Sequence, residues 1–179
     1  MLKLQSLRDF LAQCAPDLAR NPEDFIVYGD DGRLVASGTP SLSFEYRYTA
    51  YVTLLGYAGH PDAIMVPLLA WCKVNQPELL DNPDKRENAI RFAVAPQSRN
   101  TYDLGIEIDL TERAIVKPDP DHDTRLRITH PDEPGLVGLQ RFDGQDVLEL
   151  EKWELWLRDE QLLATWEFLP PVWRQRMPI

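Results

Sequence analysis

Residues 41–55 alternate between apolar and polar side chains without a break, and this alternation constrains the fold more than any other feature of the chain. Such a period of two predicts a β-strand with one buried face. Fifteen residues of strand extend about 50 Å at ~3.3 Å per residue. A strand of this length either bends or projects beyond its own core to meet another subunit. Its apolar face would consist of Leu42, Phe44, Tyr46, Tyr48, Ala50, Val52 and Leu54.

Further strands are predicted at residues 101–116 and 88–95, which alternate in the same way. The turn-forming pair Asp31-Gly32 separates residues 25–28 from residues 33–37, which predicts a β-hairpin. The apolar faces of the two further strands would point inward and consist of Tyr102, Leu104, Ile106, Ile108 and Leu110, and of Ile90, Phe92 and Val94.

Two helices are predicted from apolar residues at helical spacing. The first would start at Ser6 as the N-cap, present Leu7, Phe10, Leu11 and Cys14 on one side, and stop near Pro16. The second would cover residues 62–75, where Pro67 is expected to kink it or divide it. Strands with one apolar face and helices that must cover it predict an α+β fold, with helices packed on one face of an antiparallel or mixed sheet.

We expect this α+β unit to occupy residues 1–117. Residues 118–149 are rich in Pro, Asp and Gly and predict an irregular extension with one short strand at 125–129. Residues 150–179 form a Trp-rich C-terminal arm, which we interpret as a β-hairpin, although the apolar spacing there also fits a helix.

The chain carries 19 Lys and Arg against 29 Asp and Glu, for a formal net charge of −10. Nucleic-acid binding needs clustered cations, whereas these are scattered among carboxylates, so we expect no specific nucleic-acid binding. We expect no membrane segment, because no stretch approaches the roughly 20 apolar residues of a span. The N-terminus lacks a signal peptide, and Cys14 and Cys72 lie in apolar helical runs, so a cytoplasmic, reducing location is predicted.

No pattern predicts a metal site. Asp119, Asp121 and Asp123 imitate the first half of a calcium loop, but Thr124 and His130 stand where that loop needs Gly and Glu. None of the three histidines (His60, His122 and His130) has a second ligand at helical spacing, so zinc is not expected.

No pattern predicts catalysis either. Ser41, Ser43 and the two cysteines are the candidate nucleophiles, but the chain has no nucleophile-elbow motif. A carboxylate pair such as Glu45 and Asp103 could serve as acid and base, yet chance pairs are common among 29 acidic residues. We predict that the protein is not an enzyme and has no catalytic residues, cofactor or metal.

The candidate site is instead an interface with another subunit or with a partner protein. Aromatic residues concentrate at interface anchors. Two interpretations stay open for the arm: its tryptophans are buried when it folds back over the sheet, or they form an assembly surface. The candidate interface residues are Glu45, Arg47, Tyr51, Trp153, Trp156, Trp166 and Trp173.

A series of short motifs from about residue 6 to about residue 117 resembles, in order and spacing, the tail completion protein R family of contractile-tailed temperate phages and related tail-like bacteriocins. The resemblance is carried by Asp31-Gly32 followed by Leu34-Val35-Ala36, by Ser41-Leu42-Ser43-Phe44-Glu45-Tyr46, by Met65-Val66-Pro67 with Ala70-Trp71, and by Gln76-Pro77-Glu78.

The resemblance implies a structural tail terminator, which caps the head-proximal end of the tail tube and prepares it for head–tail joining. It also implies a ring of copies, six in number, that contacts the tail tube, the sheath and the head–tail connector. Such a protein, encoded by a phage or prophage, would assemble in the host cytoplasm and end in the virion tail. The alternative is a soluble acidic binding or assembly-accessory protein that is not part of the mature tail.

Overall fold

The computed structural model describes residues 1–36, 38–131 and 150–168. Helices and strands occur in separate runs along the described chain, as is typical of an α+β fold. The elements in chain order are α1 (Leu2–Cys14), α2 (Pro16–Arg20), β1 (Phe25–Ala36), β2 (Phe44–Tyr57), α3 (Asp62–Asn75), α4 (Glu78–Asp81), α5 (Pro83–Arg86), β3 (Ile90–Pro96), β4 (Tyr102–Pro118), β5 (Leu126–Thr129), β6 (Glu151–Leu157) and β7 (Gln161–Phe168).

The main sheet has the order β1-β2-β4-β3, and every neighbouring pair in it is antiparallel. The two long strands, β2 and β4, lie in its centre, so the strand predicted at residues 41–55 has both of its backbone edges paired inside the subunit. β5 pairs with the far end of β4, so the strand predicted near 125–129 extends the sheet. The structure confirms the predicted α+β fold.

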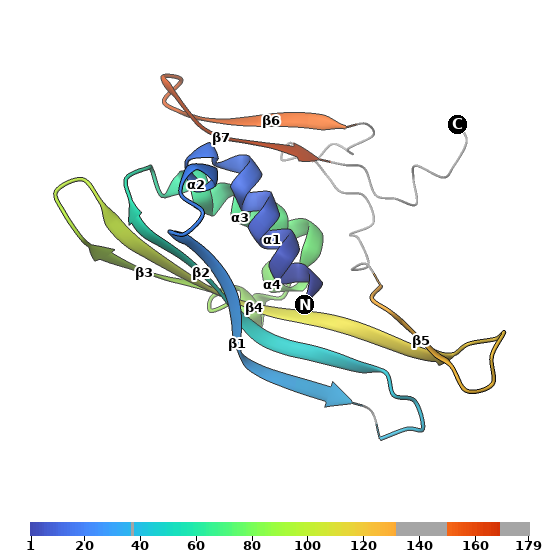
Figure 1. Cartoon of the computed structure of the whole chain (residues 1–179). Helices are drawn as coiled ribbons and strands as arrows, with labels where there is room; N and C mark the ends of the chain where they lie inside the picture. The colour runs from blue at the N-terminus through green and yellow to red at the C-terminus, as the bar shows by residue number, and fades with distance from the viewer. Residues whose placement is uncertain (37, 132–149, 169–179) are drawn as a thin grey trace.

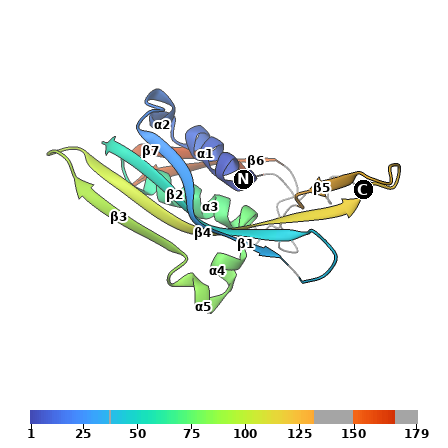
Figure 2. The same cartoon turned by 60° about the horizontal axis from the view of Figure 1, so that its bottom comes forward.

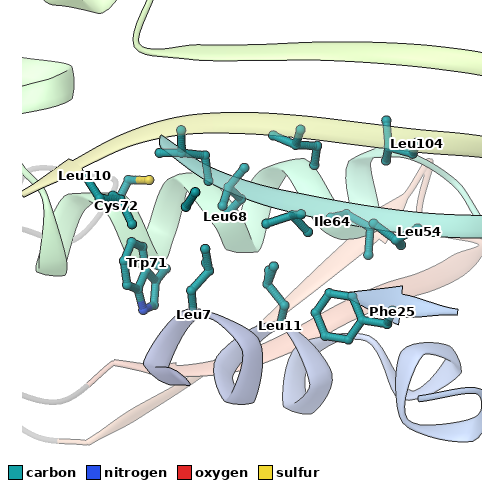
Figure 3. Packing of buried hydrophobic residues seen from close by; sticks show 14 of the residues in the cluster. Leu7, Leu11, Phe25, Leu54, Ile64, Leu68, Trp71, Cys72, Leu104 and Leu110 are labelled. Atoms are coloured by element: carbon teal, nitrogen blue, oxygen red, sulfur yellow. The ribbon is translucent and has the colours of Figure 1, made fainter. Parts of the chain in front are cut away.

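Helices α1 and α3 cover one face of this sheet, and the main core lies between the two layers (Figure 3). The alternation predicted for β2 and β4 is confirmed in the middle of both strands, where the inner side chains from Tyr48 to Leu54 and from Leu104 to Leu110 are buried. Leu42 of the predicted apolar face instead precedes β2 and is 65% exposed. Leu7 and Leu11 of α1 meet Ile64 and Leu68 of α3 above that face. No helix in the described part of the chain is long and apolar enough to cross a membrane.

Helix α1 starts earlier than the sequence predicts. Ser6 is not its N-cap, because the helix begins at Leu2. The carboxylate of Glu112 on β4 accepts hydrogen bonds from the backbone N–H groups of Leu2 (2.9 Å) and Lys3 (3.2 Å) and so satisfies the exposed donors of the first turn. The hydroxyl of Ser6 instead accepts a hydrogen bond from the indole N–H of Trp71 on α3.

Helix α3 continues through Pro67 as one element, so the proline does not divide it. Pro67 is buried, and it lies five residues after the start of the helix.

The expected hairpin at Asp31-Gly32 is wrong. β1 continues through this pair, and two residues, Asp31 and Gly32, lie opposite the single residue Tyr48 of β2. This is a β-bulge, and Asp31 adopts a left-handed conformation with φ of 53°. The residues that suit a tight turn also suit a bulge, because both need positive φ.

The expected burial of β3 is wrong for Phe92 and Val94, although Ile90 packs partly against the main core. Phe92 and Val94 are on the helix side of the sheet, since they pair with the buried residues Ile106 and Leu104. Nevertheless they remain 66% and 49% exposed. The helix layer therefore leaves the inner face of β3 uncovered from Phe92 onward.

The C-terminal segment forms the predicted β-hairpin, β6–β7, and not a helix. It packs on α1 and α3 from the side opposite the main sheet, so the molecule has three layers, with the helices in the middle (Figure 1). Its buried Ala164 and Trp166 contact Cys14 and Ala70, which form a second, smaller core.

Candidate assembly surfaces

The interface residues predicted from the sequence lie on opposite sides of the molecule. Glu45, Arg47 and Tyr51 project from β2 on the outer face of the main sheet, meaning the face turned away from the helices. Trp153, Trp156 and Trp166 lie on the β6–β7 hairpin beyond the helix layer. The two groups therefore cannot form one continuous site. Trp173 lies outside the described residues.

Three arginines surround one carboxylate at one end of the outer face. Glu45 accepts from Arg47 at 2.6 Å, and its other oxygen lies 3.8 Å from Arg113 of the paired strand β4. Arg33 lies directly opposite Arg47 across the strand pair, and within the described chain it has no carboxylate partner. Glu45 therefore pairs with two of the three arginines, and Arg33 lies two residues after the exposed carboxylate of Asp31.

A second ion-pair network crosses the outer face between β3 and β4. Arg91 donates to Glu107 at 3.0 Å and to Asp109 at 3.2 Å, and Asp109 also accepts from the hydroxyl of Thr49. Hydrogen bonds to Asp109 and Glu107 raise the pKa of Arg91. These pairs hold the edge strand β3 to the sheet, but exposed ion pairs contribute only about 0–1 kcal/mol each.

Tyr51 stacks on Tyr28 of β1 with ring centroids 5.1 Å apart. The two rings form a half-exposed aromatic patch on the outer face. Desolvation raises the pKa of Tyr51, and the nearby carboxylate of Glu107 adds to the rise. The ring stays neutral at physiological pH and is available for contact with a partner.

The described tryptophans of the hairpin do not all fit the same interpretation, because some are buried and one is exposed as an assembly surface would require. Trp166 is 6% exposed and belongs to the second core, so it is a packing residue. Trp153 is half-buried against the same core. Trp156 is 48% exposed on the other side of the hairpin, where its indole N–H donates to Glu154. Of the three described tryptophans of the arm, Trp156 is the one that fits an assembly surface.

The candidate nucleophiles are engaged in structural contacts. Ser41 donates to Ser43, whose hydroxyl also accepts from the backbone N–H of Val116 at 2.9 Å. Burial raises the pKa of both Cys14 and Cys72 to about 12, so these thiols are poor nucleophiles.

The candidate acid–base pair is not brought together. Glu45 lies opposite Arg113 near one end of the β2–β4 pair. Asp103 lies near the other end, where its carboxylate accepts from the backbone N–H of Gly56. The two carboxylates therefore cannot act on one substrate atom.

The candidate metal ligands are engaged as well. Among residues 1–36, 38–131 and 150–168, no cluster of three or more His, Cys, Asp or Glu side chains could hold an ion. Asp119 is buried and pairs with Arg127 at 3.0 Å, so it organises the β4–β5 turn. His60 accepts a hydrogen bond from the backbone N–H of Asp62 beside the start of α3, as expected for a capping imidazole.

The two open edges of the main sheet were not predicted from the sequence. Within the described residues, β1 and β3 each pair with one neighbour only, so both leave a row of backbone groups available for further pairing. The edge at β3 also exposes the apolar side chains of Phe92 and Val94. Natural proteins usually protect such edges, because they promote association with another strand. The alternating residues of β3 were the available signal, but alternation does not reveal which strand is outermost.

Comparison with known proteins agrees with the resemblance seen in the sequence. The family model described as P2 phage tail completion protein R (GpR) matches residues 1–134. The tail completion protein R of Escherichia phage P2 is 32% identical over 134 residues, which cover 75% of this chain and 84% of that relative. No solved structure matches the chain. The matched region contains the whole main sheet and every helix of the described residues, and the chain therefore belongs to the P2 phage tail completion protein R family.

Proposed function

We propose that the protein is the terminator of a contractile phage tail: a ring of six copies that caps the head-proximal end of the tail tube and prepares it for joining to the head. Membership of the family gives the chain its part in tail completion. In this proposal the ring contacts the tube, the sheath and the head–tail connector. It assembles in the host cytoplasm and remains in the finished tail.

The observation that carries the structural part of this proposal is the pair of open sheet edges on opposite sides of one subunit. A contact between two different surfaces of identical subunits is heterologous, and it closes into a ring when the rotation per subunit is right. The engaged nucleophiles and acidic side chains described above support a structural role rather than an enzymatic one.

The test is deletion of the gene from the phage or prophage that encodes it, followed by electron microscopy of the particles. We expect headless tails whose tubes have irregular, overrun ends, and restoration of normal particles when the protein is supplied from a plasmid. A tagged copy should be found at the head-proximal end of complemented tails. Normal particles without the protein would refute the proposal, and a protein that is required but absent from purified tails would favour the accessory alternative.

A further inference from the structure

We propose that the open edge of β3 pairs with the open edge of β1 in a second copy of this chain, so that one antiparallel sheet continues from subunit to subunit. This inference rests on the proposed function, which requires copies to contact each other, and it names the surfaces that do so. The ion pairs of the outer face and the hairpin tryptophans are then left for other partners.

The uncovered side chains of β3 point to a missing neighbour. Phe92 lies in one row with Ile106, Val52 and Val27, and the side chains of Ile106 and Val52 are fully buried. Phe92 itself is 66% exposed, because the helix layer ends before it reaches β3. A strand and a helix layer placed beyond β3 would cover this residue in the way that the subunit's own helices cover the rest of the row.

The other edge of the subunit supplies that arrangement. β1 lies under the start of α1, where Leu4 packs over Gly29 so closely that an added Cβ would lie 3.1 Å from it. Figure 2 shows α1 and α2 beside β1 and β2, with β3 at the opposite edge of the sheet. The helix layer is therefore displaced toward β1. A second copy that places its β1 beside β3 brings its own α1 toward the exposed Phe92.

The strand directions allow this pairing without turning the second copy over. β1 and β3 run in opposite directions, because three antiparallel steps separate them. A copy related by simple rotation thus presents an antiparallel β1 to β3. Antiparallel strands form the perpendicular pattern of hydrogen bonds already used throughout the main sheet. The same contact can then repeat from copy to copy, as a ring requires.

Exposed charges without an oppositely charged partner in the described chain lie along both edges. The carboxylates of Asp30 and Asp31, at the bulge of β1, are exposed and have no cationic partner in the described chain. On the β3 side, Arg86 precedes the strand and donates only to the carbonyl of Leu80, while Arg99 in the following turn has no carboxylate partner among the described residues. β1 also carries Arg33, which has no carboxylate partner among the described residues, and the exposed Glu87 precedes β3, so both edges carry charges of both signs.

The test is cross-linking between Ala93 of β3 and Ile26 of β1, which are exposed residues of the same row on the outer face. The variant Ala93→Cys/Ile26→Cys is treated with a short bismaleimide, both in cells that assemble tails and as concentrated purified protein. The buried Cys14 and Cys72 should not react. We expect a ladder of dimers, trimers and larger species, because each copy uses both edges, and no ladder from either single variant.

The outcomes separate the possible contacts. Dimers from Ala93→Cys alone would mean that β3 pairs with β3 of a second copy, which overturns the proposal. Monomers only, in complemented tails and in concentrated protein, would overturn it as well. Because purified protein is included, the edges are tested even if the chain never enters a tail. Absence from tails refutes the proposed function, whereas presence without a ladder refutes only this inference.

A second pair of variants tests the same edge without cysteines. Phe92→Lys places a charge on the exposed side chain of β3, a change that blocks edge association in natural sheets. Leu126→Lys is the matched control, because Leu126 is 54% exposed and lies on β5, away from both edges. We expect Phe92→Lys to stay folded by circular dichroism but to lose the cross-linked ladder and the complementation of tails. Equal loss in Leu126→Lys, or no loss in Phe92→Lys, would contradict the proposal.

Discussion

Two buried polar side chains fix the helix layer to the sheet. Glu112 is 5% exposed and accepts from the first backbone N–H groups of α1 and from the hydroxyl of Tyr48. Gln76, which is fully buried at the end of α3, donates to the hydroxyl of Thr111 at 2.9 Å and accepts from the backbone N–H of the same residue at 3.2 Å. Buried polar groups require such partners, so these two residues determine where both helices lie on β4.

We expect Glu112→Leu to lower the free energy of unfolding by about 1–3 kcal/mol or more, since each buried donor left without an acceptor costs that much. Chemical denaturation followed by circular dichroism measures the change. Glu107→Gln is the control, because Glu107 forms an exposed ion pair with Arg91 and should change stability by less than about 1 kcal/mol. Equal stability of the two variants would show that the anchoring of α1 is energetically unimportant.

Because the thiols of Cys14 and Cys72 are buried, we expect the free energy of unfolding to fall at alkaline pH. Burial raises the pKa of each thiol from 9.0 to about 12, so the folded state favours the protonated form. The resulting stability is present below pH 9, falls as the unfolded thiols ionise, and is lost as the pH rises through about 12. The double variant Cys14→Ala/Cys72→Ala should therefore show a shallower loss than the parent in denaturation series above pH 9. An equal loss of stability in the parent and the double variant would show that ionisation of these two thiols does not cause the decline.

At the scale of elements, the sequence predicts best where periodicity is long. β2 and β4 were identified with their buried faces because alternation persists over more than a dozen residues in each. The Asp31-Gly32 pair leads to a wrong prediction, because local turn chemistry does not distinguish a hairpin from a bulge inside a longer strand. The prediction of Ser6 as a cap is wrong because the actual acceptor, Glu112, is distant in sequence and contributes only after folding.

The candidate site was less predictable than the fold. Alternation gives each strand two faces, but only the tertiary arrangement decides that α1 and α3 leave Phe92 and Val94 uncovered. Likewise, the number of tryptophans in the arm does not reveal that Trp166 points toward the helices and Trp156 away from them. These distinctions depend on the order of strands and on the offset of the helix layer, which are non-local properties.

The hairpin β6–β7 provides a matched pair of variants at this scale. Trp166→Ala should lower the free energy of unfolding by about 3 kcal/mol, since it removes a buried indole from the second core. Trp156→Ala should change it by about 0.5 kcal/mol or less, as exposed positions usually do. Thermal and chemical denaturation measure both. A larger loss of stability in Trp156→Ala than in Trp166→Ala would contradict the orientation of the hairpin described above. A loss of tail completion in Trp156→Ala alone would identify Trp156 as a contact residue.

At the scale of the whole molecule, two electrostatic effects oppose each other when copies associate. Every subunit carries a net charge of −10, so like subunits repel. The proposed edge contact would bring exposed charges of both signs together, but exposed ion pairs contribute only about 0–1 kcal/mol each. The repulsion acts over the full surface and should outweigh this attraction. The isolated protein is therefore expected to associate weakly and to assemble fully only on the tail tube.

Salt should then strengthen self-association of the isolated protein. Raising the ionic strength from about 0.1 M to about 1 M shortens the Debye length from about 10 Å to about 3 Å, which screens repulsion between whole subunits. Apolar contacts at Phe92 and Val94 are not weakened by this screening. Sedimentation or light scattering across a concentration series should show a larger average mass at high salt, and Phe92→Lys should reduce that gain. A mass that falls steadily with salt would mean that attraction between opposite charges dominates the contact.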